Sequence, residues 1–230
     1  MLVFKDNRRY LVIAVILGII VISSLLYGFS RLKKQVITTI PQAKNLNVPF
    51  TDQAPKANWQ EPWLDACEET SIIMADNFYK NTKITPDQAK QQILAILAVK
   101  DQHFGVSKDE SMERIAEIVN LAKLPWKAVV SVNPLLNDIK KEIAQGHPVI
   151  APIDPSLLKN SPYTGDSLKY HVLIISGYDD KTKKFIVQDP GSTGGKNNTY
   201  DYQNFYDAIN DYLPNDSPSG RKAVLFTSLN

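Results

Sequence analysis

The pattern of apolar and polar positions separates an apolar N-terminal stretch from a longer region of mixed character. Residues 10–29 carry no charge, and twenty residues in a helix span about 30 Å, the thickness of a bilayer's hydrocarbon core. Tyr10 and Tyr27 stand near the two ends, where aromatic side chains meet the membrane surface. The following Phe29-Ser30-Arg31 is a poor cleavage site for a signal peptide. The pattern therefore predicts one transmembrane helix, an uncleaved signal anchor.

The residues on either side of this span form an arm and a stalk, and the main domain follows. Residues 1–9 form a short N-terminal arm, and residues 30–46 form a polar, basic stalk. Basic residues lie on both sides of the span, so charge alone does not orient it. A short arm is easily retained inside, and a long domain crosses largely regardless of nearby charge. We expect a single-pass membrane protein that contacts the lipid bilayer through residues 10–29, with residues 47–230 outside the cytoplasm.

Apolar residues at helical spacing predict four helices in the first part of the domain. The first covers about residues 66–80, and the second runs from Thr85, a capping residue followed by proline, to about Lys100. The third begins near Ser107 with Glu110 three residues later, as in a capping box. The fourth follows Asn133-Pro134 and stops at Gly146, a typical C-terminal cap.

Short apolar or β-branched runs bounded by turn residues predict strands in the second part of the domain. They cover residues 126–132, 148–153, 170–176, 185–188 and 223–227, and a short helix is expected over 202–213. Gly177 is expected to end the third of these strands. Helices first and an antiparallel sheet second define an α+β domain.

Composition narrows the functional classes. The formal net charge is +2, and seven of the basic residues lie before the domain, so the rest of the chain is close to neutral and no basic face for nucleic acid is expected. The chain has one cysteine, which excludes an intramolecular disulfide and a zinc site built from several cysteines. No metal or organic cofactor is indicated by the sequence.

That cysteine, Cys67, stands where the first helix of the domain should begin. A helix N-terminus presents free N–H groups and a partial positive charge, which favour the nucleophilic thiolate. Glu68 and Glu69 would complement the helix start, but they oppose thiolate formation, so Cys67 needs a cationic partner. The alternative is a buried, inert cysteine that serves only packing.

His171 is the candidate partner, at the start of a buried strand. Asp189 follows eighteen residues later, at the end of the next strand. If the two strands pair as a hairpin through residues 178–184, the two side chains lie across from each other, about 5 Å apart at Cβ. A carboxylate there would orient the imidazole toward a nucleophile. A core histidine and a turn aspartate are the structural alternatives.

Acyl transfer also needs donors for the developing oxyanion. The backbone N–H of Cys67 would be one, and the amide of Gln53 or Gln60 the other. His103, in a loop, and His147, which would need a carboxylate such as Asp154, are weaker candidates for the base.

Five segments together resemble the bacteriocin-processing peptidase-like family of the papain superfamily of cysteine peptidases, over about residues 46–228. The order of a Val-Pro motif, a Gln, a Cys, a His and an Asp-Pro motif is more specific than any single segment. The segments are Val48–Pro55, Asn58-Trp59, Cys67–Ser71, Tyr170–Val172 and Phe185–Pro190.

The resemblance implies a papain-like fold and hydrolysis of a peptide or protein substrate through a thioester. It assigns Cys67 as nucleophile, His171 as base, Asp189 as the orienting carboxylate and Gln53 as the oxyanion amide. Cys67-Glu68-Glu69 replaces the Cys-Gly-Pro or Cys-Gly-Leu of transporter-linked members, and the chain carries no exporter domain or nucleotide-binding P-loop. The stand-alone branch of this bacterial family is therefore the closer match.

Two other functions fit the same residues. The first is a catalytically silent papain-like module that binds a partner at the cell surface. The second is a cell-wall amidase or transpeptidase that uses the same triad. The sequence leaves the substrate, the specificity and the oligomeric state open.

Overall fold

The structure is a computed structural model whose chain divides into two compact units, Met1–Thr39 and Ile40–Asn230. It describes residues 15, 17–19, 21–23, 40–160, 162–163, 169–213 and 220–230. In the first unit the described residues are helical, and apolar side chains such as Val15 and Ile19 are exposed. Among the described residues, no helix has the length and apolar character to cross a membrane. The predicted span 10–29 lies largely outside them and stays a prediction.

The second unit is built on a seven-stranded sheet in the order β2-β7-β3-β4-β5-β6, with β1 added beside β4. All pairings are antiparallel. Strands β3 and β4 are central and almost wholly buried, which explains their nearly continuous apolar sequence. The strands are β1 Ala43–Asn45, β2 Trp126–Val132, β3 Val149–Ile153, β4 His171–Asp179, β5 Lys184–Gln188, β6 Lys196–Asp201 and β7 Ala223–Leu229.

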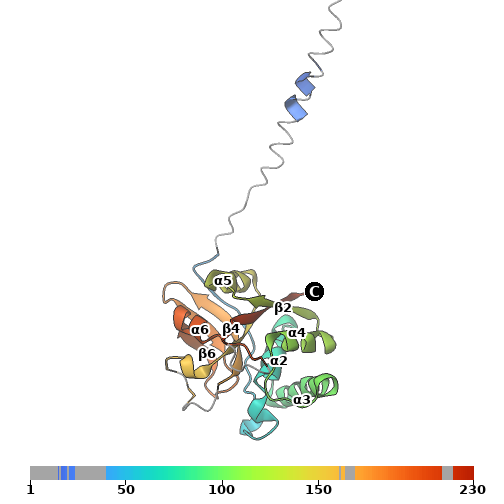
Figure 1. The fold of residues 1–230 in the computed structure, drawn as a ribbon, viewed down its shortest axis with the longest axis vertical. Helices are drawn as coiled ribbons and strands as arrows, with labels where there is room; N and C mark the ends of the chain where they lie inside the picture. Colours follow the sequence, from blue (N-terminus) through green and yellow to red (C-terminus); the bar gives the residue numbers. More distant parts are fainter. Residues whose placement is uncertain are drawn as a thin grey trace, which may run out of the picture. The chain divides into compact units, whose positions relative to one another are not determined.

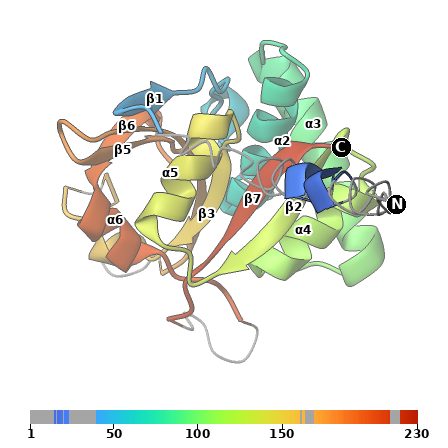
Figure 2. The same ribbon diagram turned by 90° about the horizontal axis from the view of Figure 1, so that it is seen from above.

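The helices cover this sheet (Figures 1 and 2). Helix α2 packs on β4, α3 packs on α2, α4 packs on β2, and α5 contacts β1, β3, β4 and β7. Helix α6 lies at the other end of the domain, beside β5 and β6 (Figure 2). This confirms the predicted α+β class. The helices are α2 Cys67–Tyr79, α3 Pro86–Phe104, α4 Met112–Leu121, α5 Leu136–Gln145 and α6 Tyr202–Ala208, and the short 3-10 turns are η1 Pro55–Ala57, η2 Trp63–Asp65 and η3 Pro155–Leu157.

Two of the three predicted capping residues are confirmed. Thr85 caps α3 in a capping box, and Gly146 ends α5 in a left-handed conformation with φ 97°. The predicted start near Ser107 is wrong, because α4 begins at Met112 with Ser111 as its cap. The Ser107 hydroxyl does bind the Glu110 carboxylate, but in a non-helical segment. A serine and a glutamate three residues apart can pair without starting a helix.

The strand predictions fail where chain segments far apart in sequence meet. Strand β4 continues through Gly177 to Asp179 instead of ending there. A Cβ atom on Gly177 would lie 2.7 Å from the carbonyl oxygen of Lys44, so this glycine marks the close approach of β1. Because β1 belongs to the sheet, the compact unit begins at Ile40, within the range predicted as stalk. The polar strand β6 was not predicted, and α6 ends at Ala208, before residue 213.

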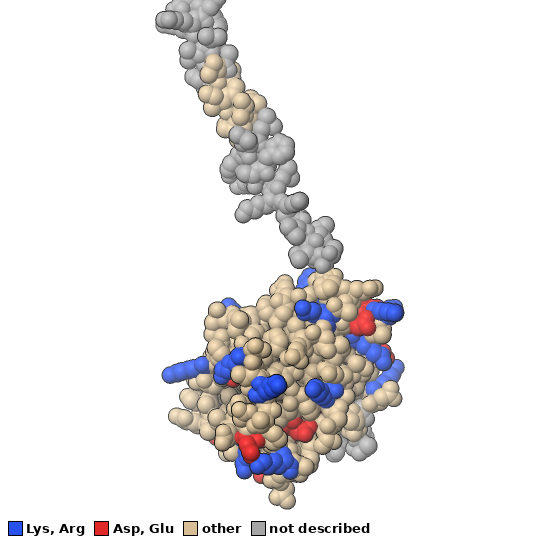
Figure 3. Space-filling view, turned by 180° about the vertical axis from the view of Figure 1, so that it is seen from behind, with Lys and Arg blue, Asp and Glu red and all other residues tan. Residues whose placement is uncertain are grey.

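The face of the domain in Figure 3 carries separated basic side chains. Lysine and arginine side chains stand singly or in small groups among uncharged residues, with a few acidic groups between them. Nucleic-acid recognition relies on basic side chains clustered on one face. This face presents dispersed charges.

Gly177 gives a test of the β1–β4 contact. In Gly177→Val, the added side chain meets the β1 backbone, and we expect the free energy of unfolding to fall by about 1–3 kcal/mol. The measurement is the midpoint of urea unfolding of the full chain. Gly194→Ala is the matched control, because a Cβ there meets no atom within 4 Å. Equal midpoints for both variants would contradict the proposed role of Gly177.

Candidate active site

The first turn of α2 brings Cys67 to the start of β4. Helix α2 begins at Cys67, and residues 67–77 are all buried. One turn later, the hydroxyl of Ser71 donates to the carbonyl oxygen of Val172 at 3.3 Å. The backbone of Val172 also lies close enough to the Cys67 sulfur to lower the pKa of its thiol. Two contacts therefore fix the beginning of α2 against the residue that follows His171.

His171 and Asp189 form a buried pair. The Nε2 atom of His171 lies 2.8 Å from Oδ1 of Asp189, and both residues are 2% exposed or less. The predicted direct opposition across a hairpin is wrong, because Ile174 pairs with Gln188 and a bulge follows at Ser176. If this register is continued past Gln188, Asp189 lies opposite Leu173. His171 is two residues before Leu173, so the Asp189 carboxylate reaches the imidazole along the diagonal between the two strands.

The carboxylate of Asp189 is held by three donors that converge on Oδ1. Tyr163 donates its hydroxyl at 2.6 Å, the backbone N–H of Gly191 lies at 3.1 Å, and His171 supplies the third bond. The Tyr163 hydroxyl is also 2.9 Å from Nε2 of His171, and its ring packs against the imidazole. Burial alone would raise the pKa of Asp189, but the charge of His171 and these hydrogen bonds hold that pKa below its usual value.

The surroundings of Cys67 do not favour the thiolate in the way that its helix position predicts. Burial is the largest influence and raises the pKa of the thiol well above its ordinary value, and a charge on the Glu68 carboxyl would raise it further. The thiol donates to Oε2 of Glu68 at 3.0 Å. Within the described part of the chain, no hydrogen bond joins the sulfur to His171, whose Nδ1 is the ring nitrogen not bound to Asp189.

Glu69 forms a second buried ion pair beneath this site. Its Oε1 lies 3.2 Å from Nζ of Lys100, and both side chains are 3% exposed or less. Lys100 also donates to the carbonyl oxygen of Ser107 at 2.7 Å. The interpretation of Glu68 and Glu69 as groups that merely complement a helix start is therefore corrected: both are core residues with specific partners.

Gln53 lies between the nucleophile segment and the Asp189 segment. Its backbone N–H donates to the carbonyl oxygen of Pro190 at 2.9 Å. Its side-chain nitrogen donates to the carbonyl oxygens of Trp63 and Leu64, at 3.2 and 2.7 Å, and its Oε1 is buried without a partner. The amide is thus near the site but occupied by backbone carbonyls. Gln60, the alternative, is exposed.

The other histidines lie apart from this group. Nδ1 of His103 bonds the carbonyl oxygen of Val99 at the exposed end of α3. The carboxylate beside His147 is that of Glu142, at 2.9 Å, and not Asp154, which was named from the sequence as an example of such a partner. Asp154 instead caps the turn η3 through the backbone N–H of Ser156. In the described residues, no group of His, Cys, Asp or Glu side chains could hold a metal ion.

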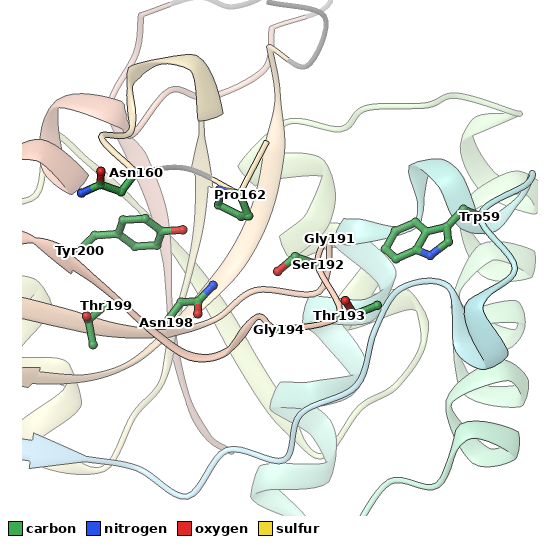
Figure 4. Close-up of a pocket in the computed structure, with 10 residues that line it drawn as sticks. All are labelled: Trp59, Asn160, Pro162, Gly191, Ser192, Thr193, Gly194, Asn198, Thr199 and Tyr200. Atoms are coloured by element: carbon green, nitrogen blue, oxygen red, sulfur yellow. The ribbon is translucent and has the colours of Figure 1, made fainter. Parts of the chain in front are cut away.

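A cavity of about 700 Å³ opens beside the Asp189 loop (Figure 4). Figure 4 shows Trp59 at one end, the 191–194 loop in the middle, and Asn160 and Tyr200 at the other end. The loop reaches the pair described above, since a Cβ on Gly191 would lie 2.7 Å from Cε1 of His171. No charged side chain lines the cavity among the described residues. It offers an uncharged, polar surface, one side of which is the loop that packs against the imidazole.

Two contributors to this site were missed by the sequence reasoning. Tyr163 lies in a loop without periodicity, and no sequence pattern indicated its contacts. Lys100 looked like the end of a helix, but it is buried against Glu69. Neither pairing leaves a spacing signal, since the partners lie more than twenty-five residues apart in the chain. Apolar periodicity and helix-capping patterns concern residues close together in the chain, so they do not indicate contacts of this kind.

Three comparisons bear on this geometry. A model of the Peptidase_C39 like family matches residues 45–215. A crystal structure described as a C39-like peptidase from Bacillus anthracis has a TM-score of 0.53 and 16% identity, covering 80% of this chain and 96% of that one. Xylellain, a cysteine protease from Xylella fastidiosa, has a TM-score of 0.37 and 13% identity, covering 86% and 90%. No curated protein matches. The Bacillus anthracis structure shares the fold of this chain.

The Glu69–Lys100 pair predicts a large stability effect. Lys100→Met leaves the Glu69 carboxylate buried without its cation, and we expect a loss of about 3–5 kcal/mol in the free energy of unfolding, measured by urea unfolding of the full chain. Lys108→Met is the control, because Lys108 is 71% exposed and bridges Glu61 and Asp65 at the surface. Its expected effect is below about 1 kcal/mol. Similar losses in both variants would contradict this assignment.

Proposed function

The chain belongs to the Peptidase_C39 like family, and from this we infer that its cysteine peptidase chemistry is carried by Cys67, His171 and Asp189. The observation that carries the proposal is the 2.8 Å pair of His171 and Asp189, buried beside the residue that contacts the Cys67 sulfur. The substrate is a peptide or protein. The papain-like arrangement supports peptide-bond hydrolysis through a thioester.

The proposed mechanism assigns one task to each side chain. Asp189 binds Nε2 of His171 and leaves Nδ1 to accept the thiol proton of Cys67. The thiolate attacks the carbonyl carbon of the substrate, and the imidazolium then protonates the leaving amine. Water resolves the thioester with His171 as base, which regenerates the thiol. Tyr163 supports this scheme as a positioning residue, because it holds both members of the pair.

The backbone N–H of Cys67 and the amide of Gln53 are proposed to stabilise the oxyanion. The position of Gln53, between Leu64 and Pro190, supports this role. Its amide nitrogen is engaged by two carbonyls, so one of these bonds must be released when substrate binds. The uncharged cavity beside His171 supports the same site as the place where a substrate segment lies.

Replacement of His171 tests the triad directly. In His171→Ala the thiol loses its base, and we expect peptide hydrolysis to fall by about 10²–10⁴-fold. Hydrolysis of a mixed peptide library, followed by mass spectrometry, measures this loss. Alkylation of Cys67 by iodoacetamide near neutral pH should slow in the same variant. His147→Ala is the matched control, since His147 also pairs with a carboxylate but lies before β3.

The outcomes separate the proposed function from its alternatives. Slow alkylation that does not depend on His171, without peptide cleavage, would contradict the triad and favour a catalytically silent binding module. Cleavage or transfer on peptidoglycan fragments, with intact library peptides, would instead identify a cell-wall amidase or transpeptidase. Loss of activity in both histidine variants would point to a general loss of structure.

We further propose that residues 10–29 anchor the domain in a membrane, with the domain outside the cytoplasm. The uncharged sequence supports this. Lysine in place of Ile19 and Ile22 should abolish anchoring, because each buried charge costs about 2.5–3.5 kcal/mol on insertion scales. Alkaline extraction of membranes measures it, with Ile19→Leu and Ile22→Leu as the control. Recovery of the unmodified chain in the soluble fraction would contradict the proposal, and protection from protease added outside would contradict the orientation.

A further inference from the structure

Glu68 is the polar group in contact with the sulfur of the proposed nucleophile. It follows Cys67 in the first turn of α2 and is 2% exposed. Its Oε2 lies 3.0 Å from the Cys67 sulfur, and its Oε1 accepts the backbone N–H of Glu110 at 3.1 Å. Both carboxyl oxygens are therefore committed to partners inside the protein.

Glu68 and Glu69 differ in whether a cationic side chain lies beside them. Glu69 has Lys100 as its cation. Among the described residues, no lysine, arginine or histidine nitrogen lies within the 4.0 Å ion-pair distance of Glu68. A buried carboxylate without a cation is costly, so the neutral acid is the favoured form. Accordingly, burial first and then the charge of Glu69 raise the pKa of Glu68 well above its ordinary value.

The elements packed around Glu68 add negative or neutral groups. Glu69 lies on the same helix, and Lys100 of α3 is bound to Glu69. The segment before α4 contributes Asp109, whose pKa burial raises to about 6, and Glu110. The phenol of Tyr170, before β4, donates to the carbonyl oxygen of Glu110 and not to Glu68. The surroundings thus give Glu68 a reason to keep its proton.

We propose that Glu68 is a further catalytic residue: its neutral carboxyl donates a hydrogen bond to the Cys67 sulfur and stabilises the thiolate that forms when His171 takes the thiol proton. The 3.0 Å contact serves both states. The thiol donates to Oε2 at rest, and Oε2–H donates to the thiolate afterwards. In this step Glu68 keeps its own proton, so the only proton that moves is the one that passes from the thiol to His171. This inference rests on the proposed role of Cys67 as nucleophile.

The contact makes Cys67 and Glu68 titrate as a pair. When the pair holds one proton, it exists either as a thiolate beside a neutral acid or as a thiol beside a carboxylate. Both forms hold the same number of protons, so a change of pH does not alter the ratio between them. The fraction of thiolate therefore rises in two steps, separated by a plateau. In Glu68→Gln the side chain at this position is neutral at every pH and can still donate a hydrogen bond to the sulfur. The step that Glu68 contributes is then lost, and the thiolate forms at a pH between the two wild-type steps, because no carboxylate competes for the proton.

The test is the rate of Cys67 alkylation by iodoacetamide in the full chain, from about pH 5 to pH 9. Every alkylation event reports this sulfur, because the chain has one cysteine. We expect a plateau in the wild-type profile, and its loss in Glu68→Gln, where the thiolate forms at a pH between the two wild-type steps. Glu68→Ala removes the donor as well as the charge, so at neutral pH it should react about tenfold more slowly than Glu68→Gln. Identical profiles for the two variants would overturn the proposal.

Two controls make the result specific. Asp109→Asn removes the neighbouring carboxyl whose pKa burial raises to about 6, and it should keep the wild-type plateau. Loss of the plateau in Asp109→Asn would assign it to Asp109 and overturn the pair. His171→Ala tests the triad separately. If His171→Ala leaves alkylation unchanged, the proposed function fails, while the comparison of Glu68→Gln with Glu68→Ala still decides the role of Glu68.

Infrared spectroscopy gives a measurement that does not depend on the alanine variant folding. The difference spectrum of wild type and Glu68→Gln at neutral pH should show the loss of a carboxylic acid band. Loss of a carboxylate band instead would show that Glu68 is ionised, and would overturn the proposal.

Discussion

The docking of the first turn of α2 onto the start of β4 is the contact on which the site depends. It buries Cys67, Glu68 and Glu69 together, and it sets the sulfur beside the residue after His171. Water cannot solvate ionisable groups in such a position, so each one needs a partner from the protein. The partner differs from group to group. Glu69 is paired with Lys100. The Glu68 carboxyl accepts a backbone N–H and the thiol of Cys67, and that same contact with Glu68 is the polar contact of the Cys67 thiol.

The second half of the site is stiffened by hydrogen bonds that join distant segments. Oδ1 of Asp189 receives three donors, and one of them, Tyr163, also contacts His171. Through its backbone, Gln53 ties the segment before Cys67 to Pro190, just after Asp189. A change in the Asp189 loop is therefore transmitted both to the imidazole and to the residues that precede the sulfur. The uncharged cavity beside Gly191 shares this loop, which couples its shape to the orientation of His171.

The sequence was sufficient for features that depend on neighbours along the chain. The periodicity located α2, Thr85 and Gly146 marked helix ends, and the apolar runs located β3, β4 and β7. Features that depend on contacts between distant segments were not predictable. Gly177 looked like a strand end, because its reason, the approach of β1, lies more than 130 residues away. For the same reason Glu68 and Glu69 were interpreted as acidic residues that complement a helix start, and no sequence pattern indicated the contacts of Tyr163.

The central claim is that the Cys67 sulfur and the His171 imidazole act as one unit. The most direct measurement is acylation by a small activated ester, followed by intact mass and peptide mapping over time. The account predicts that a single acyl group appears on Cys67 and is then released by water, and that both steps slow in His171→Ala. Acylation confined to lysine side chains, or an acyl-Cys67 that forms and decays at the same rate without His171, would contradict it.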